Sequence, residues 1–330
     1  MSAPTVLVTG ASGMLGGAVA TALRDRGATV RAFQRRPAGI DGVQDVTGSL
    51  TESEDVRRAV HGADAVIHLA AKVSISGPEH EYRAINIEGT RHVVDALRAQ
   101  GGGALVNVSS PSVAHLGRAI VGADATAADP SKARGPYART KAAAELLAMG
   151  ADGTDGLRVT SIRPHVVWGP GDTQLVGRIV DRARRGRLPL LDDGMALIDT
   201  TYVTNAAEAI LAGLDRIEDV HGESFVVSNG EPRTVRDVFA GWCEAAGVPA
   251  PTLRVPGSAA RFAGRVIERI WEKRPGHDEP PMTEFLAEQM STAHWFDQRR
   301  TRERLHWTPG VSMDEGNALL AAWYREHPIH

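Results

Sequence analysis

A tyrosine and a lysine set four residues apart, Tyr137 and Lys141, are the side chains in this sequence best placed to do chemistry together. Residues four apart share one face of a helix, so we expect the Lys141 ammonium to lie beside the Tyr137 phenol. A neighbouring cation would lower the pKa of the phenol from its usual value of about 10. A phenol tuned in this way can pass a proton to or from a substrate oxygen.

A glycine-rich turn near the start of the chain predicts a dinucleotide site. Gly10, Gly13 and Gly16 lie between an apolar run at residues 5–9 and a helical stretch at residues 14–26. Glycines let the backbone approach a pyrophosphate, and the helix N-terminus supplies oriented N–H groups. The spacing departs from the G-x-G-x-x-G fingerprint, so the prediction depends also on the flanking strand and helix and on the downstream tyrosine–lysine pair.

Strand-like and helix-like segments alternate along the chain. We expect strands at residues 5–9, 29–33, 43–46, 65–69, 104–108, 158–162 and 224–227, and helices at 14–26, 52–61, 82–100, around Tyr137 and at 235–247. This alternation predicts an α/β fold, a Rossmann doubly wound parallel sheet with a smaller C-terminal α/β substrate lobe. We expect residues 1–170 to form the NADP-binding domain and residues 171–330 to form mainly the substrate lobe, with some crossing back to the sheet.

Composition excludes several classes of function. A net charge of -3 over 330 residues offers no basic field for nucleic acid. Cys243 is the only cysteine, which excludes an internal disulfide and a cysteine metal cage, and we expect it to be a small buried residue. No HxxxH, HExxH or Cys/His cluster predicts a metal site. Without a leader-like N-terminus or an apolar run of transmembrane length, a cytoplasmic protein is expected.

The end of the second strand favours NADPH. NAD-preferring proteins usually place Asp or Glu there, whereas this chain has Gln34, Arg35 and Arg36. Guanidinium groups bind a 2′-phosphate through charge-assisted bidentate hydrogen bonds, and Arg35 is the better candidate. Arginines that are merely solvated are the alternative, and NAD(H) stays possible.

Six blocks of sequence, in order, resemble the extended short-chain dehydrogenases. They are the glycine motif at 9–16, Leu69-Ala70-Ala71, Asn86, the serines at 109, 110 and 112, residues 137–141, and Arg163-Pro164 with residues 168–170. Within that superfamily the chain is similar to the 3β-hydroxysteroid dehydrogenase branch. It is more narrowly similar to the 2-alkyl-3-oxoalkanoate reductases of bacterial olefin and β-lactone biosynthesis, through residues 111–115, 168–176, 199–202, 228–232 and 279–289.

The resemblance implies a role for each matched residue. Tyr137 would donate the proton, Lys141 would bind the nicotinamide ribose, and a serine hydroxyl would hold the substrate carbonyl. We choose Ser110, because Pro111 occupies the next position, where sugar-nucleotide members carry their hydroxyl; Ser109 and Ser112 remain candidates, as does a capping role for the whole cluster. The cofactor-binding residues implied are Gly10, Ser12, Gly13, Met14, Leu15, Arg35, Arg36, Leu69, Ala70, Ala71, Ser109, Tyr137, Lys141, Pro164 and Val166.

Two polar positions have open roles. Ser49 stands where relatives commonly have an aspartate facing the adenine, and it could still form a hydrogen bond. Asn86 is either a structural hydrogen-bonder or part of a water-mediated proton relay.

Four residues are candidates for substrate contact: Ser112, His115, His165 and Trp168. The two histidines, with Arg118, could meet a substrate carboxylate, although a loop histidine with structural partners is the plainer interpretation of each. Residues 259–271 predict an amphipathic helix, either packed in the core, covering an alkyl tail or contacting a membrane surface. A second apolar segment, with Phe285, Leu286, Met290, Trp295 and Phe296, could line the same pocket and suits a long alkyl substrate.

These observations lead to one hypothesis and three rivals. The hypothesis is an NAD(P)H-dependent oxidoreductase that reduces the ketone of a 2-alkyl-3-oxoalkanoic acid, a small hydrophobic substrate. The rivals are a 3β-hydroxysteroid or sterol-4-carboxylate dehydrogenase, a sugar-nucleotide epimerase or dehydratase, and a non-catalytic NADP-sensing protein. A homodimer is expected by family analogy alone.

Overall fold

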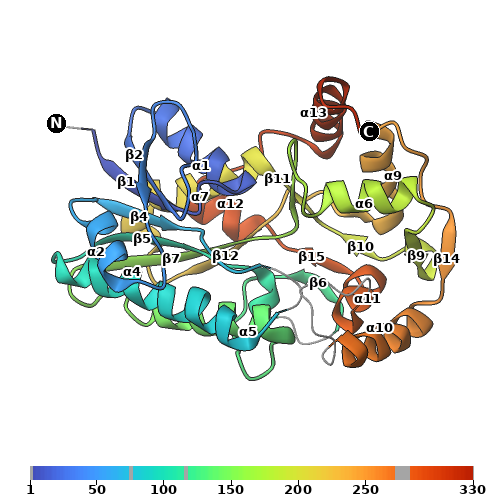
Figure 1. The fold of residues 1–330 in the computed structure, drawn as a ribbon, viewed down its shortest axis with the longest axis horizontal. Helices are drawn as coiled ribbons and strands as arrows, with labels where there is room; N and C mark the ends of the chain where they lie inside the picture. Colours follow the sequence, from blue (N-terminus) through green and yellow to red (C-terminus); the bar gives the residue numbers. More distant parts are fainter. Residues whose placement is uncertain (1–2, 74–76, 115–117, 272–282, 330) are drawn as a thin grey trace.

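A computed structural model describes residues 3–73, 77–114, 118–271 and 283–329. Its centre is a seven-stranded parallel sheet in the order β12-β7-β5-β4-β1-β2-β3, which confirms the expected Rossmann sheet (Figure 1). Its strands are β1 (Thr5–Thr9), β2 (Thr29–Gln34), β3 (Gln44–Thr47), β4 (Ala65–His68), β5 (Gly103–Val108), β7 (Leu157–Pro164) and β12 (Ser224–Val227). The central strands are buried on both faces, which agrees with their continuous apolar runs.

Helices cover both faces of this sheet (Figure 1). One face packs on α1 (Met14–Asp25), α7 (Val203–Asp215), α8 (Ile217–Val220) and α12 (Arg299–Leu305). The other packs on α2 (Ser53–Val60), α4 (Gly89–Ala99) and α5 (Gly135–Met149). The single helix expected at residues 82–100 is divided into α3 (Glu79–Tyr82), a π-helical turn η1 (Arg83–Glu88) and α4. A π-helical turn inside a helix often marks a functional position, and Asn86 lies in this one.

A second, smaller sheet lies beside the first, in the order β13-β10-β15-β6. Its strands are β6 (Ile120–Ala123), β10 (Leu197–Ile198), β13 (Arg233–Thr234) and β15 (His294–Phe296), and the pairs β8 (Val167–Trp168) with β11 (Thr201–Tyr202) and β9 (Pro189–Leu191) with β14 (Leu253–Val255) flank it. The helices around it are α6 (Val176–Arg184), α9 (Val235–Ala245), α10 (Gly257–Trp271), α11 (Glu284–Ser291) and α13 (Met313–Glu326), with short 3-10 turns η2 (Pro111–Ala114) and η3 (Asp192–Gly194). We call this region the C-terminal lobe.

The chain passes between the two regions more than once. After the lobe has begun, α7 and β12 return to the large sheet, whereas β6, from the first half of the chain, pairs with β15 in the lobe. The lobe has a core of its own, in which Trp168 packs on Tyr202 and Trp242 with ring centroids 5.3 and 5.5 Å apart. Cys243 is buried in the same core, and burial raises the pKa of its thiol to about 11.

Helix α10 buries only part of its apolar stripe, because Ile267 and Trp271 are partly buried while other large apolar side chains are exposed. Its fully buried positions are the small residues Gly257, Ala260 and Gly264, and a Cβ at Gly264 would lie 2.6 Å from the Thr283 carbonyl carbon. On the opposite side, Phe262 is 68% exposed and Ile270 is 52% exposed. None of the described helices has the length and apolar character needed to cross a bilayer.

Candidate active site

The glycine turn between β1 and α1 has the geometry of an anion cradle. Gly10 adopts φ +79°, and the Gly13 N–H donates to its carbonyl oxygen at 3.1 Å. A side chain at Gly16 would collide with the Gly10 backbone. Helix α1 begins at Met14 without a side-chain cap and without an acidic residue in its first turn, so the N–H groups of its first turn are available. A diphosphate fits this end of the helix.

The end of β2 presents two exposed arginines, Arg35 and Arg36, and a glutamine that is already engaged. Gln34 accepts a hydrogen bond from the Ser12 N–H at 2.8 Å, which ties the strand end to the glycine turn. The structure also places a carboxylate beside this strand end, which the sequence did not lead us to expect. Asp45 of β3 lies 3.4 Å from the Gln34 amide nitrogen and accepts from the N–H of Ala38 at 2.7 Å.

Ser49 is held by its own turn. Its N–H donates to Asp55 at 3.0 Å, and its hydroxyl lies 2.7 Å from that of Thr51. The hydroxyl therefore has a local partner and is less free to contact an adenine than the aspartate common in relatives.

A buried hydrogen-bond chain supports the segment after β4. Thr90 donates to the Asn86 carbonyl at 2.6 Å, so its oxygen accepts from His68 Nε2 at 3.1 Å, and His68 Nδ1 accepts from Thr9 at 2.8 Å. Burial, with the nearby Lys141 charge, lowers the pKa of His68 to about 3 and keeps the ring neutral. Thr9 also accepts from the Ala70 N–H at 3.0 Å, which fixes the segment facing Gly10.

The Asn86 side chain is fully occupied. Its oxygen accepts from the Lys72 N–H at 2.7 Å, and its amide donates to the Lys72 carbonyl at 3.2 Å and to Thr140 at 3.0 Å. These bonds join the segment after β4 to helix α5. The geometry therefore favours the structural interpretation of Asn86 over the proton relay.

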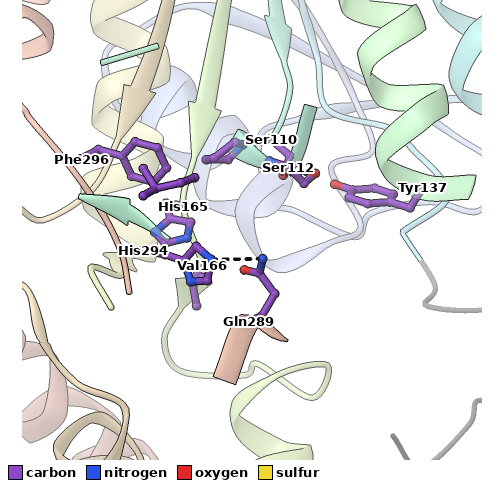
Figure 2. A pocket seen from close by; sticks show the side chains of 10 residues that line it. Ser110, Ser112, Tyr137, His165, Val166, Gln289, His294 and Phe296 are labelled. Atoms are coloured by element: carbon purple, nitrogen blue, oxygen red, sulfur yellow. Dashed lines mark hydrogen bonds between the residues drawn. The ribbon is translucent and has the colours of Figure 1, made fainter. Parts of the chain in front are cut away.

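Tyr137, Ser110 and Lys141 meet at the carboxyl edge of β5. In Figure 2 the Tyr137 hydroxyl points toward Ser110, whose own hydroxyl lies 2.9 Å from that of Ser112. The Lys141 ammonium donates to the Val108 carbonyl at 2.7 Å, and burial lowers its pKa to about 8. The expected lowering of the Tyr137 pKa is wrong, because burial raises the pKa and only the nearby Ser110 hydroxyl opposes the rise. The Lys141 ammonium is bonded to the backbone instead.

An ion pair lies behind this centre. Arg163 and Glu145 are each 2% exposed and 2.5 Å apart, and Glu145 also accepts from Ser224 at 3.0 Å. Arg163 holds the pKa of Glu145 below its usual value against the effect of burial, and the nearby Ser109 hydroxyl acts in the same direction. Of the three candidate serines, Ser109 therefore faces the ion pair, while Ser110 and Ser112 face the phenol.

A cavity of about 170 Å³ opens in front of Ser110 and Tyr137 (Figure 2). It is lined by Ser110, Pro111, Ser112, Ile120, Tyr137, His165, Val166, Gln289, His294 and Phe296. Figure 2 shows the Tyr137 hydroxyl pointing toward the serines, with Gln289 and the histidines on the other side. Hydroxyl groups and a phenol thus face imidazole, amide and apolar groups across one space.

His165 and Val166 follow β7 in a constrained turn. His165 Nδ1 donates to the Asp199 carbonyl at 2.5 Å, so a neutral ring carries its lone pair on Nε2. Val166 adopts φ +46°, a region that costs a β-branched residue about 1–3 kcal/mol, and the Thr201 N–H holds it there by donating to its carbonyl at 3.1 Å. Burial raises the pKa of Asp199 to about 6.

Two polar lining residues, Gln289 and His294, were not among the site residues predicted from the sequence. Gln289 comes from α11 and His294 from the three-residue β15, and the Gln289 amide nitrogen lies 3.4 Å from His294 Nε2. The histidine stands in no motif. Its place in the cavity comes from the pairing of β15 with β6, opposite Ile120.

Other expected substrate residues lie elsewhere. Trp168 is fully buried in the lobe core and donates to Thr200 at 2.9 Å, so its assignment to the substrate is wrong. Arg118 is exposed and does not line the cavity, and His115 lies outside the described residues. Of the expected apolar segment, Phe296 lines the cavity, whereas Leu286 and Met290 pack into the lobe core.

Comparison with known proteins identifies the family of this chain. Residues 6–228 match the NAD dependent epimerase/dehydratase family. The chain belongs to this family. Within it, the chain is 38% identical to a 2-alkyl-3-oxoalkanoate reductase of Stenotrophomonas maltophilia (strain K279a), over 96% of this chain and 98% of that protein. A 2-alkyl-3-oxoalkanoate reductase of Shewanella oneidensis is 34% identical, over 96% and 85% of the two chains.

Proteins that are less similar to this chain include a steroid dehydrogenase and a protein solved with a sugar nucleotide. A 3-beta-hydroxysteroid dehydrogenase of Mycolicibacterium neoaurum is 28% identical over 97% of this chain and 91% of that protein. The solved structure of MoeE5 with UDP-glucuronic acid and NAD has a TM-score of 0.74 at 26% identity, covering 98% and 99% of the two chains. The resemblance to the extended short-chain dehydrogenases is confirmed. The protein is an NAD(P)-dependent oxidoreductase of that group.

Proposed function

We propose that this protein reduces the ketone of a 2-alkyl-3-oxoalkanoic acid to the 3-hydroxy acid, with NADPH as its preferred reductant. One observation carries the proposal. The cavity has Ser110 and Tyr137 on one wall, polar His165 and Gln289 on the other, and apolar Phe296 of β15 also in its lining. These walls suit a ketone oxygen, a carboxylate and an alkyl chain respectively.

Tyr137, Ser110 and Lys141 each have a separate role in the reduction of the ketone. A nicotinamide dinucleotide, when bound, supplies the hydride that the ketone carbon receives. Tyr137 donates its phenolic proton to the ketone oxygen, and the Ser110 hydroxyl holds that oxygen. Lys141 is charged below its pKa of about 8, so it stabilises the phenolate left behind and supports the return of a proton.

The carboxylate of the substrate is recognised on the lobe side. The Gln289 amide can donate a hydrogen bond, and His165 presents Nε2, which becomes a donor when the ring is protonated. Gln289 faces the cavity from α11 and His165 from the turn after β7, and neither element carries Tyr137 or Ser110. The assignment of Ser112 to the substrate is compatible with this arrangement, because its hydroxyl lies beside that of Ser110.

The preference for NADPH has a separate basis. Arg35 and Arg36 are exposed at the end of β2, and no ion pair joins either one to another described residue. The neutral Gln34 stands where a ribose-binding acid would repel a phosphate. The two 2-alkyl-3-oxoalkanoate reductases aligned over almost the whole chain support the choice of substrate.

Oxidation of NADPH, followed by absorbance, tests the proposal. A racemic 2-alkyl-3-oxo fatty acid and a 3-ketosteroid are compared, each with NADPH and with NADH. We expect fast turnover of the oxo acid with NADPH. Turnover of the steroid alone would assign the protein to the sterol branch, and no turnover of either compound with tight NADPH binding would favour a sugar nucleotide substrate or a sensor.

A further inference from the structure

Helix α10 presents two different faces, one used by the fold and one not. The side that packs on α11 buries the small residues Ala260 and Gly264 completely and Ile267 and Trp271 in part. The opposite side carries a stripe of exposed apolar side chains at helical spacing: Ala259, Phe262, Ala263, Val266 and Ile270. Phe262, Val266 and Ile270 are 68%, 41% and 52% exposed, so each leaves much of its apolar surface in water.

The charges of α10 border this stripe. The helix contains three arginines, at 261, 265 and 269, against the single glutamate at 268. Arg265 is 2.5 Å from Glu284, and Arg261 donates to Ser291 at 2.7 Å, so these two also tie α10 to α11. Arg269 forms no ion pair with any residue that the structure describes and lies on the exposed side. An apolar stripe edged by cations complements an anionic, apolar surface.

The stripe is linked to the substrate cavity through one helix. Next to α10, α11 carries Gln289 in the cavity wall. Glu288 of the same helix pairs with Arg134 at 2.7 Å, immediately before the helix that bears Tyr137. A surface bound at α10 therefore lies one helix away from the reacting groups, on the side of the lobe.

We propose that α10 docks the protein on an anionic lipid bilayer, with the stripe at the level of the acyl chains and Arg269 among the headgroups. A bilayer suits the stripe better than a protein groove, because the stripe contains no polar group that would fix the orientation of a partner. This proposal goes beyond the reaction and does not depend on it. An amphiphilic substrate with two alkyl chains would, however, be collected from the same bilayer.

Co-sedimentation of the full-length protein with vesicles tests the docking. One set of vesicles is phosphatidylcholine alone, and the other also contains phosphatidylglycerol. We expect binding to the second set that weakens with added salt, as headgroup attraction requires. The double variant Phe262→Ser/Ile270→Ser should bind at least about tenfold more weakly, because both side chains would lose their burial. Leu319→Ser, which changes a 47% exposed leucine on α13, is the matched control and should bind as wild type.

Three outcomes would overturn the proposal. They are a wild-type protein that stays in the supernatant with both vesicle sets, a double variant that sediments like wild type, and a dimer in solution that the double variant dissociates without any vesicle binding. The last would assign the stripe to a second copy of the chain. NADPH oxidation with a short, water-soluble oxo acid should be equal in all variants, so a failure of the proposed reaction would be seen separately from a failure of docking.

Discussion

The two walls of the cavity differ in how firmly their polar groups are held. Behind Tyr137, the side chains of Lys141, Glu145 and Arg163 are at most 4% exposed and each has hydrogen-bonded partners. On the facing wall His165 is also buried and bonded to Asp199, but Gln289 stands on an eight-residue helix and its contact with His294 is 3.4 Å long. The comparison indicates that the groups behind Tyr137 are fixed by several short hydrogen bonds, whereas Gln289 is the least firmly held polar group of the cavity.

Removing the proton donor should have the largest effect. In Tyr137→Phe the ring still fills its site, but the ketone oxygen receives no phenolic proton. We expect kcat to fall about 10²- to 10⁴-fold. NADPH affinity, measured by fluorescence titration, should be almost unchanged and serves as the control. Turnover near the wild-type rate would remove Tyr137 from the mechanism.

The buried ion pair tests how rigid the Tyr137 wall is. Arg163→Met leaves the Glu145 carboxylate buried without its cation and should cost about 3–5 kcal/mol of unfolding free energy in urea. The double variant with Glu145→Gln should recover part of that loss. Arg185→Met, which breaks an exposed pair with Asp181, is the matched control and should cost less than about 1 kcal/mol. Equal costs for the two single variants would show that the wall is not specially held.

Most of the Tyr137 wall could be predicted from the sequence, and most of the facing wall could not. The apolar runs of β1, β4 and β5, the glycines at 10, 13 and 16, and the spacing of Tyr137 and Lys141 are local patterns with a direct physical meaning. His294 reaches the cavity because β15 pairs with β6 across a long stretch of chain, and Gln289 of α11 contacts it there. Likewise, periodicity revealed the stripe on α10, but the direction it faces depends on the close approach of Gly264 to Thr283.

Two buried groups, one under the glycine turn and one in the C-terminal lobe, should change the unfolding free energy in opposite directions as the pH falls. His68, under the glycine turn, has its pKa lowered from 6.5 to about 3, so the unfolded chain takes up a proton first as the pH falls. By pH 5 this should remove about 2 kcal/mol of stability. Asp199, in the lobe, has its pKa raised from 3.8 to about 6, so the folded chain binds the proton first and gains about 1 kcal/mol over the same range.

The measurement is urea unfolding at pH 7 and pH 5. Wild type should lose stability on acidification, whereas His68→Gln should gain slightly, because only the Asp199 contribution remains. A His68→Gln protein that loses as much stability as wild type would mean that the ring is not held neutral in the fold.

The facing wall should affect substrate affinity more than chemistry. Gln289→Leu removes an amide that we assign to the carboxylate, and a hydrogen bond to a charged group is worth about 1.5–3 kcal/mol. We expect KM for the oxo acid to rise about 20-fold with kcat changed much less. The corresponding ketone without the carboxylate should show no such change. Gln174→Leu, on the surface of the lobe, is the control. A parallel loss for acid and ketone would contradict the assignment.

The smallest expected effect concerns the cofactor end, where Arg35 is exposed and its attraction to a phosphate is screened by water. Arg35→Ala should weaken NADPH binding about tenfold and leave NADH binding unchanged, because only the 2′-phosphate distinguishes the two. Arg36→Ala should have a smaller effect, since Arg35 is the one next to Gln34. The Asp45 carboxylate lies beside Gln34 and would repel a 2′-phosphate. Arg35 must therefore offset this negative charge as well as bind the phosphate. An equal loss for NADPH and NADH would mean that Arg35 contacts a part common to both dinucleotides, and the 2′-phosphate assignment would then be wrong.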